Sequence, residues 1–249
     1  MSSTTHVLIT GTNRGIGKGL LSTYLARPNH ILIAGVRDPS SASSKALSAL
    51  PHGENSKVIV VKIDSLSQTD ALTAVQTLKS EYKITKLDIV IANAGIANQW
   101  GPARTTPAKA MIEHFEVNVV GPLLLFQATA ELLDAAPEPK FFTISSVVGS
   151  VSYQDKLPLE SSAYGTSKAA LNFVTARIHF ENPKIVAAPV HPGWLQTEMG
   201  NDSAKGVGME EAPVSVEEGV AGIIDKLDKA TKEKSSGTFL SFDGEPVGW

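Results

Sequence analysis

The chain has 249 residues, of which 42% are hydrophobic and 19% are charged, and its formal net charge is -3 at pH 7. These values are ordinary for a soluble globular protein and suit one large α/β domain or two small ones. The balance of charge implies no basic face, so nucleic acid is not an expected partner. Because the chain has no cysteine, disulfides, thiolate nucleophiles and cysteine-based metal sites are excluded.

The first residues, MSSTTHVLITG, contain a short apolar run that leads directly into a glycine loop. This pattern predicts a strand rather than a signal peptide, which would need a basic segment and a longer apolar one. The longest apolar runs, such as VVGPLLLF, are too short to span a bilayer. We therefore expect a cytoplasmic protein that does not bind membranes.

Short apolar runs alternate with longer segments of helical spacing along the whole chain. Most of the runs lack polar alternation, which is typical of parallel strands covered on both faces. The expected strands are 6–10, 30–35, 57–63, 87–93, 140–145, 184–190 and 237–242, and the clearest helical segments are 67–82, 107–134 and 161–181. This alternation predicts an α/β fold: one domain over residues 1–249, with a doubly wound, seven-stranded, mostly parallel sheet of Rossmann type and helices on both faces.

One stretch after the sixth expected strand breaks this alternation. Residues 198–213, EMGNDSAKGVGMEEAP, are polar and rich in glycine. We interpret residues around 196–213 as a mobile loop or a lid over the substrate.

A glycine loop, TGTNRGIGKGL at 10–20, follows the first expected strand and opens a helix. Its glycines, Gly11, Gly15 and Gly17, allow a tight turn and a close approach of the backbone to a pyrophosphate. The helix N-terminus attracts the same group through its free N–H groups and its dipole. A glycine-rich turn without a ligand is the alternative, but the position between the first strand and a helix favours a dinucleotide.

The residues after the second strand suggest which dinucleotide binds. An NAD site usually places an acid at the end of this strand to accept from the ribose hydroxyls, and Val36 cannot do so. Arg37 can instead pair with a 2′-phosphate, and Arg14 of the glycine loop could reach the same group. Asp38 could serve as the ribose acid, but we expect it to cap the turn before Pro39. The pattern therefore favours NADP(H) over NAD(H).

Six motifs in order resemble the short-chain dehydrogenase/reductase family over residues 5–244. They are TGTNRGIG at 10–17, NAG at 93–95, Asn118 in FEVNVVG, ISSVVG at 144–149, YGTSK at 164–168 and HPGWLQT at 191–197. The ending GTFLSFDGEPVGW resembles the small carbonyl-reductase branch, which includes the C-signalling factor, the sniffer protein and fungal norsolorinic acid ketoreductases. One departure is the distance of 18 positions between Ser146 and Tyr164, longer than is usual in the family.

Tyr164 and Lys168, one helical turn apart, are the expected proton-transfer pair. A positive charge ~4 Å from a phenolate contributes about 4 kcal/mol at an effective dielectric of ~20. Such a charge could lower the tyrosine pKa from ~10 to about 7, within reach of exchange at neutral pH. The chemistry is then reduction of a carbonyl, with hydride from NADPH and a proton from Tyr164.

The resemblance assigns the other catalytic roles. Ser146 would hold the substrate carbonyl, with Ser145 as the alternative, since neighbouring strand residues face opposite ways. Asn118 would hold a water beside Lys168, and Lys168 would also hold the nicotinamide ribose. The alternative for Asn118 is a polar residue that bends a helix.

The expected cofactor contacts extend over five loops. Asp64 would either touch the adenine or cap the next helix, and Thr197 would donate to the nicotinamide carboxamide. The full predicted set is Gly11, Asn13, Arg14, Gly15, Ile16, Gly17, Arg37, Asp64, Asn93, Ala94, Gly95, Tyr164, Lys168, Pro192, Gly193 and Thr197.

The expected substrate is a small-molecule carbonyl compound that is apolar and could be aromatic. An apolar pocket could use Trp100, Tyr153, Trp194 and Met199, although core or lid packing is an equal alternative for each. No metal site is expected, since no metal-binding pattern occurs, and the histidines other than His191, among them His114, are assigned to the surface or to strand ends. His191 is given no catalytic role. The family resemblance implies a homodimer or homotetramer.

Two other functions remain open at this point. One is an NAD-linked alcohol dehydrogenase that works in the oxidative direction. The other is a non-catalytic nucleotide sensor or signalling protein with the same fold. The four residues Asn118, Ser146, Tyr164 and Lys168 argue against a sensor, which would not need all of them.

Overall fold

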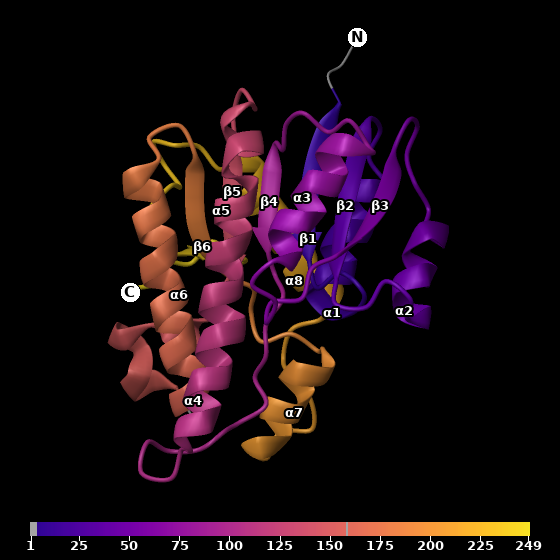
Figure 1. Cartoon of the computed structure of the whole chain (residues 1–249). Helices are drawn as coiled ribbons and strands as arrows, with labels where there is room; N and C mark the ends of the chain where they lie inside the picture. Colours follow the sequence, from indigo (N-terminus) through magenta and orange to yellow (C-terminus); the bar gives the residue numbers. More distant parts are fainter. Residues whose placement is uncertain (1–3, 158) are drawn as a thin grey trace.

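The computed structural model describes residues 4–157 and 159–249. In this part of the chain the strands are β1 Thr5–Thr10, β2 His30–Val36, β3 Lys57–Lys62, β4 Ile89–Ala92, β5 Lys140–Ile144, β6 Val186–His191 and β7 Leu240–Ser241. They form one sheet in the order β3-β2-β1-β4-β5-β6-β7, and every neighbouring pair is parallel (Figure 1).

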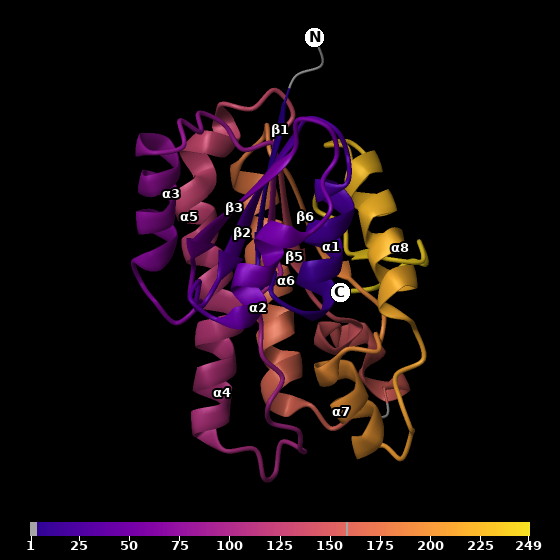
Figure 2. The same cartoon turned by 90° about the vertical axis from the view of Figure 1, so that its right-hand side faces the viewer.

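Helices cover both faces of this sheet. They are α1 Gly15–Leu25, α2 Ala42–Lys45, α3 Asp70–Ser80, α4 Ala108–Phe115, α5 Gly121–Asp134, α6 Ser162–Glu181, α7 Glu198–Gly206 and α8 Val216–Lys229. Figure 2 shows α3 and α5 on one side of the sheet and α1 and α8 on the other. The predicted Rossmann-type α/β fold is confirmed.

The strands are apolar on both sides because each side faces a helical layer. Along β1, Val7 and Ile9 pack in the cluster beneath α1 and α8, whereas Leu8 packs in the cluster beneath α3 and α5. Successive strand residues point to opposite faces, so a strand between two layers must be apolar throughout. This is why the continuous apolar runs predicted the strands well.

The helical segments differ from the sequence prediction in detail. The segment 107–134 is not one α-helix, because a π-helical turn, η2 Glu116–Val120, lies between α4 and α5. In α3, the buried face uses Ala71, Ala74, Val75 and Leu78. Leu72, which shares the spacing of Val75 and Leu78, is 52% exposed instead.

Residues 198–206 of the expected loop form α7, so the prediction of a loop was wrong for this part, whereas residues 207–213 are not helical and the role as a lid stays a prediction. Thr197 caps the helix by accepting from the Gly200 N–H at 3.1 Å. A side chain at Gly200 would overlap the Leu195 carbonyl, so this glycine marks close packing rather than a break in structure. The polar composition follows from the position of α7 at the edge of the molecule, below the sheet in Figure 1.

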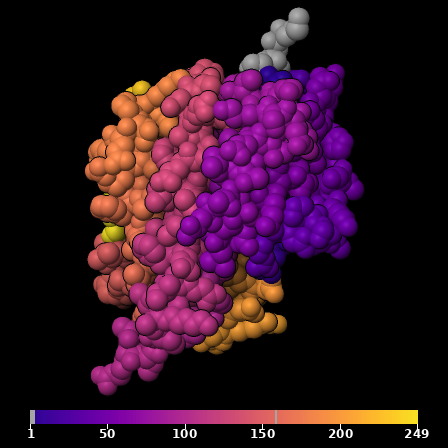
Figure 3. Space-filling view, viewed as in Figure 1, coloured from indigo at the N-terminus to yellow at the C-terminus, as the bar shows by residue number. Residues whose placement is uncertain are grey.

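The connections at the carboxyl edge of the sheet form the lower part of the molecule. The loop before α4 extends furthest from the sheet, and α7 lies beside it (Figure 3). Among the described residues, no helix combines the length and the apolar character that crossing a membrane requires.

Candidate active site

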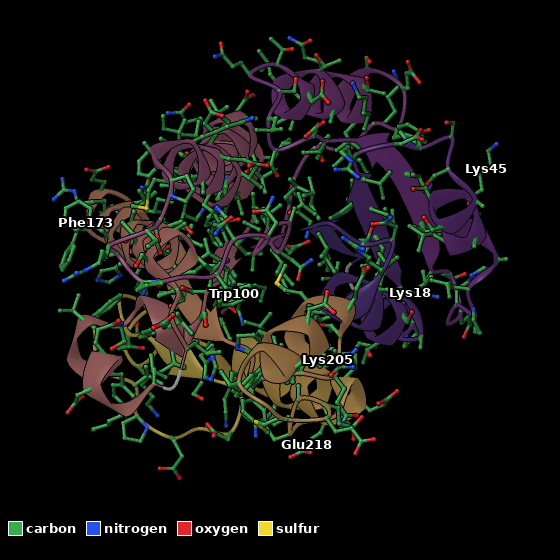
Figure 4. All side chains as sticks on the ribbon, turned by 90° about the horizontal axis from the view of Figure 1, so that it is seen from below. Lys18, Lys45, Trp100, Phe173, Lys205 and Glu218 are labelled. Carbon is green, nitrogen blue, oxygen red and sulfur yellow. The ribbon has the colours of Figure 1, made fainter. Side chains whose placement is uncertain are left out.

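The predicted site residues gather at the carboxyl edge of the central strands. The glycine loop follows β1, Asn93–Gly95 follow β4, and Ser146 follows β5. Tyr164 and Lys168 reach this edge from α6. Figure 4 shows this edge of the sheet from below. Trp100 lies near the middle of the view, and Lys18 of α1 lies well to its right. Ligands of parallel sheets of this kind bind at this edge, near the point where the strand order reverses.

The glycine loop has the conformation that its sequence predicts. Gly11 and Gly15 have φ values of 69° and 53°, in the left-handed region that favours glycine. A Cβ at Gly17 would overlap the carbonyl oxygen of Gly11. The Asn93 amide donates to the Thr10 carbonyl at 2.8 Å and so ties the end of β4 to the loop. The loop is therefore a tightly fitted turn at the start of α1, and it presents the geometry that a pyrophosphate requires.

Tyr164 and Lys168 lie on one face of α6, as the spacing predicts. The Lys168 ammonium lies 5.6 Å from the centre of the Tyr164 ring and donates to the Ile144 carbonyl at 2.8 Å. Only 4% of Lys168 is exposed. The residue therefore places a cation at the end of β5, beside the phenol.

The pKa of Tyr164 differs from the sequence expectation. Burial of the hydroxyl raises this pKa to about 12, although the Ser146 side chain acts in the opposite direction. Burial also lowers the pKa of Lys168 to about 8. The expected lowering of the Tyr164 pKa was therefore wrong, because loss of hydration raises it and outweighs the opposing hydrogen bond of Ser146. A tyrosine with this pKa is protonated at neutral pH, which is the state that a proton donor needs.

The structure separates the two serines of the ISSVVG motif. The Ser145 hydroxyl donates to the side-chain Oδ1 of Asn172 on α6 at 2.5 Å and is buried in that contact. The Ser146 hydroxyl faces the other way, interacts with Tyr164 and accepts from the Val148 N–H at 3.2 Å. Ser146 is therefore the serine beside the phenol, as the motif predicts.

Asn118 lies in the π-helical turn η2 and is fully buried. Its carboxamide accepts from the Ile96 N–H at 2.8 Å and donates to the Ile96 carbonyl and the Ser167 hydroxyl, both at 2.9 Å. A Cβ at Gly95 would lie 3.0 Å from the Asn118 Oδ1 and 3.6 Å from the Lys168 Nζ. Asn118 thus holds the loop after β4 against α6. It lies in an irregular turn of the helix, as the helix-bending alternative expected, and such π-turns are frequent at functional sites. The water-holding role stays a prediction.

The residues assigned to the adenosine side lie at the surface. Arg14 forms an ion pair with Glu198 of α7, and Asn13 donates to Ser43 at 3.2 Å. Arg37 is exposed and forms no hydrogen bond or ion pair with another described residue. Asp38 accepts from the N–H and the hydroxyl of Ser40, and these contacts hold its pKa below the usual value. Asp38 therefore closes the turn around Pro39, as expected.

Asp64 accepts from the Leu66 N–H at 3.0 Å, whereas the N-cap position of α3 belongs to Thr69. Asp64 therefore caps a turn and not the helix. Gly193, after β6, has a φ of 90°, and a Cβ there would press on the Phe242 ring at 2.8 Å. Thr197 lies beside Gly15, and its hydroxyl is engaged in capping α7.

The four residues assigned to the substrate pocket do not converge. The Trp100 ring packs on the Tyr164 ring at 5.6 Å, directly at the catalytic pair. The Trp194 N–H donates to the Gly200 carbonyl and the Ser203 hydroxyl, so this residue anchors α7. The Tyr153 hydroxyl donates to the Pro246 carbonyl, and Met199 is 38% exposed.

Two residues at the site were not expected there from the sequence. His114 was assigned to the surface or a strand end, but it is fully buried on α4 with its ring edge toward Tyr164, at 6.5 Å between centroids. His114 lies one turn before Asn118, and this spacing was the available signal. His191 accepts from the Val147 N–H at 3.3 Å, directly after Ser146. Among the described residues, no group of three or more His, Asp or Glu side chains could hold a metal ion.

This arrangement of a glycine loop with a serine, a tyrosine and a lysine defines an oxidoreductase of Rossmann type. A family model described as short chain dehydrogenase matches residues 5–208. The chain belongs to the short-chain dehydrogenase/reductase family.

Individual relatives lie within this family. A norsolorinic acid ketoreductase of Emericella nidulans is 44% identical over 98% of this chain and 94% of the relative. Another, of Dothistroma septosporum, is 44% identical over 100% of this chain and 94% of the relative.

Two solved structures match over nearly the full length of both chains. The NADPH-bound carbonyl reductase from chicken fatty liver has a TM-score of 0.87 and 29% identity, with 100% of each chain covered. The carbonyl reductase Sniffer of D. melanogaster has a TM-score of 0.83 and 25% identity, with 99% of this chain and 100% of the other covered.

Proposed function

We propose that the protein is an NADPH-dependent carbonyl reductase that acts on an apolar ketone or aldehyde, including aromatic ones. The observation that carries this proposal is the meeting of Ser146, Tyr164 and Lys168 beside the glycine loop. The names of the relatives, which include ketoreductases and carbonyl reductases, support the same reaction class.

The residues present fit a dinucleotide cofactor. Gly11, Gly15 and Gly17 let the backbone reach a pyrophosphate, and Gly95 leaves a space beside Lys168 that a side chain would fill. Arg14 and Arg37 would hold a 2′-phosphate, and Lys168 would hold the nicotinamide ribose. The bound cofactor supplies the hydride, and the protein supplies orientation and electrostatics.

The catalytic residues would share the proton transfer and the stabilisation of charge. Because the Ser146 oxygen accepts from the Val148 N–H, its proton is available to a substrate carbonyl. Tyr164, protonated at neutral pH, would donate to the developing alkoxide. The Lys168 cation would stabilise the phenolate that remains. Asn118 would keep the loop after β4 in place and, as the resemblance implies, hold a water for proton return.

Replacement of Tyr164 by phenylalanine tests this mechanism. The variant keeps the ring against Trp100 but lacks the proton donor, so we expect kcat to fall by about 10²- to 10⁴-fold. The assay follows NADPH consumption with a panel of ketones, aldehydes and quinones that includes norsolorinic acid. Fluorescence titration should show a much smaller change in NADPH affinity than in kcat, because the other predicted cofactor contacts remain. Near wild-type turnover by the variant with every good substrate would overturn the mechanism.

The alternative is an NAD-linked alcohol dehydrogenase. The absence of an acid at the end of β2 and the exposed Arg37 disfavour it. Fluorescence titration with NADPH and NADH compares the two cofactors directly. Equal affinity or a preference for NADH would contradict the role that we assign to Arg37.

We further propose that the protein forms a homodimer or homotetramer and works in the cytoplasm. Large apolar side chains on α4 and α6 are exposed, and a groove of about 400 Å³ lies between these helices. A surface of this kind favours burial against another protein surface. The compartment is a prediction that microscopy of a tagged chain would check.

A further inference from the structure

The hydrogen-bond ladder between β5 and β6 ends next to the catalytic serine. The last paired residues are Ile144 and Val190, and the Ser145 N–H donates to the Val190 carbonyl at 2.8 Å. Beyond this point the chain turns into η3 Val147–Gly149, a 3₁₀ turn that Ser146 caps. Backbone pairing can no longer hold the chain here, so another group must determine where Ser146 lies.

His191 supplies the next link between the two strands. It is the last residue of β6, and its Nδ1 accepts from the Val147 N–H at 3.3 Å. A nitrogen that accepts carries no proton, so the neutral ring bears its hydrogen on Nε2. The turn after β5 therefore depends on a histidine in one tautomer.

The surroundings of His191 keep its ring in this orientation and uncharged. Its backbone pairs with Ser241 of β7, and the N–H of Phe242, the next residue, donates to the His191 carbonyl at 3.0 Å. The Phe242 ring stands edge-on at 6.4 Å between centroids. Burial lowers the pKa of His191 to about 4, and the nearby Asp243 carboxylate only partly opposes this effect. Nδ1 therefore remains an acceptor at neutral pH.

We propose that His191 is the positioning residue for the catalytic serine: it holds the Val147 N–H and thereby sets the turn that directs the Ser146 hydroxyl toward Tyr164. Two hydrogen bonds then act in series. His191 fixes Val147, and the next amide, Val148, fixes the Ser146 oxygen. Ser145 is held separately by Asn172 on the other side. This role rests on the proposed carbonyl reduction, in which Ser146 contacts the substrate.

Three substitutions at His191 separate positioning from simple packing. In His191→Asn the side-chain oxygen can take the place of Nδ1, whereas in His191→Gln the oxygen lies nearer the place of Nε2, and His191→Leu has no acceptor. We expect kcat to fall by roughly 10- to 100-fold in the Leu and Gln variants, because small displacements of a catalytic group reduce the reaction rate by about this factor. The Asn variant should stay within about 3-fold of the wild type.

Two further measurements accompany the kinetics. NADPH affinity, from fluorescence titration, should change less than kcat in all variants, because the His191 side chain contacts Val147 and Phe242 and not the glycine loop, although Pro192 and Gly193 follow it in the chain. Amide hydrogen exchange, followed by NMR, should show protection of Val147 in the wild type and the Asn variant and its loss in the Gln and Leu variants. His52→Gln, at an exposed loop histidine, is the matched control, and thermal unfolding checks that each variant is folded.

The outcomes separate this inference from the proposed function. If the wild type reduces no carbonyl of the panel, the proposed function fails, and hydrogen exchange alone still decides whether His191 holds the turn. If the wild type is active, equal kcat values in the Gln, Leu and wild-type proteins overturn the inference. It is also overturned if Val147 stays protected in the Leu variant, or if the Asn variant is no better than the Gln variant.

Discussion

Lys168 is buried in a place where a charged group is costly. Its ammonium group donates to the Ile144 carbonyl, yet loss of hydration lowers its pKa from 10.5 to about 8. The unfolded chain therefore binds one more proton than the folded chain between these two values, and the free energy of unfolding rises with pH through this window. At neutral pH the folded protein therefore carries a buried lysine cation that the proposed mechanism uses and that lowers the free energy of unfolding.

Replacement of Lys168 by methionine should therefore separate stability from activity. We expect the variant to be more stable than the wild type at pH 7 by up to roughly 3 kcal/mol, reduced by about 1 kcal/mol for the lost hydrogen bond. This difference should shrink as the pH rises from 8 toward 10.5, because the wild-type lysine loses its charge. Urea unfolding at pH 7 and at pH 10 measures both values, and NADPH consumption should show a loss of activity. A variant less stable than the wild type at pH 7 would contradict this view.

At the scale of elements, α7 is tied to the glycine loop. Glu198, in the first turn of α7, pairs with Arg14, and Thr197 lies against Gly15. Trp194 holds the body of the helix through Gly200 and Ser203. If Arg14 holds the 2′-phosphate as proposed, Glu198 would compete with that phosphate for the guanidinium group.

Replacement of Glu198 by glutamine should strengthen NADPH binding. The change frees Arg14 from a pair whose members are both largely exposed, so we expect a decrease of about 2- to 5-fold in the NADPH dissociation constant. NADH affinity should change less, because NADH lacks the 2′-phosphate. Fluorescence titration of both cofactors measures the difference. Glu217→Gln, in the first turn of α8, is the control, and weaker NADPH binding by the Glu198 variant would refute the competition.

At the scale of the whole molecule, one surface of the helical layer is unusually apolar. Phe173 and Phe180 on α6 are 69% and 72% exposed, and Ile112 and Phe115 on α4 are 59% and 46% exposed. Figure 4 shows Phe173 pointing away from the body of the protein. Burial of a phenylalanine contributes about 1.5–3 kcal/mol, so a pair of such surfaces would associate.

The double variant Phe173→Glu/Phe180→Glu should therefore form a smaller assembly than the wild type: a monomer if the wild type is a dimer, and a dimer or a monomer if it is a tetramer. We expect the wild type to elute as a dimer or tetramer in size-exclusion chromatography with light scattering. Leu66→Glu, at an exposed leucine of another face, should leave assembly unchanged. A wild type that is monomeric at micromolar concentration would disprove the assignment of this surface.

Much of the fold was predictable because the evidence for it is local in the sequence. The apolar runs identified the strands, since residues between two helical layers are apolar on both sides. Helix boundaries were less predictable. The π-turn at Asn118 contacts Ser167, which is distant in the sequence, and α7 depends on the close packing of Gly200 against Leu195, which residue types alone do not show. The spacing of Tyr164 and Lys168, in contrast, is sufficient to place both side chains on one face of a helix.

The sequence by itself determined the fold class, the glycine loop and the placement of Tyr164 and Lys168 on one face of a helix, because each depends on residue type and on spacing along one element. The family motif indicated Ser146 as the serine beside Tyr164, whereas only the tertiary structure decided that the pKa of Tyr164 is raised and that His114 and His191 lie at the site. These properties depend on contacts between elements far apart in the chain and on the exclusion of water from the groups they enclose. The residues next to a side chain in the sequence do not determine which distant group it contacts or how much water reaches it.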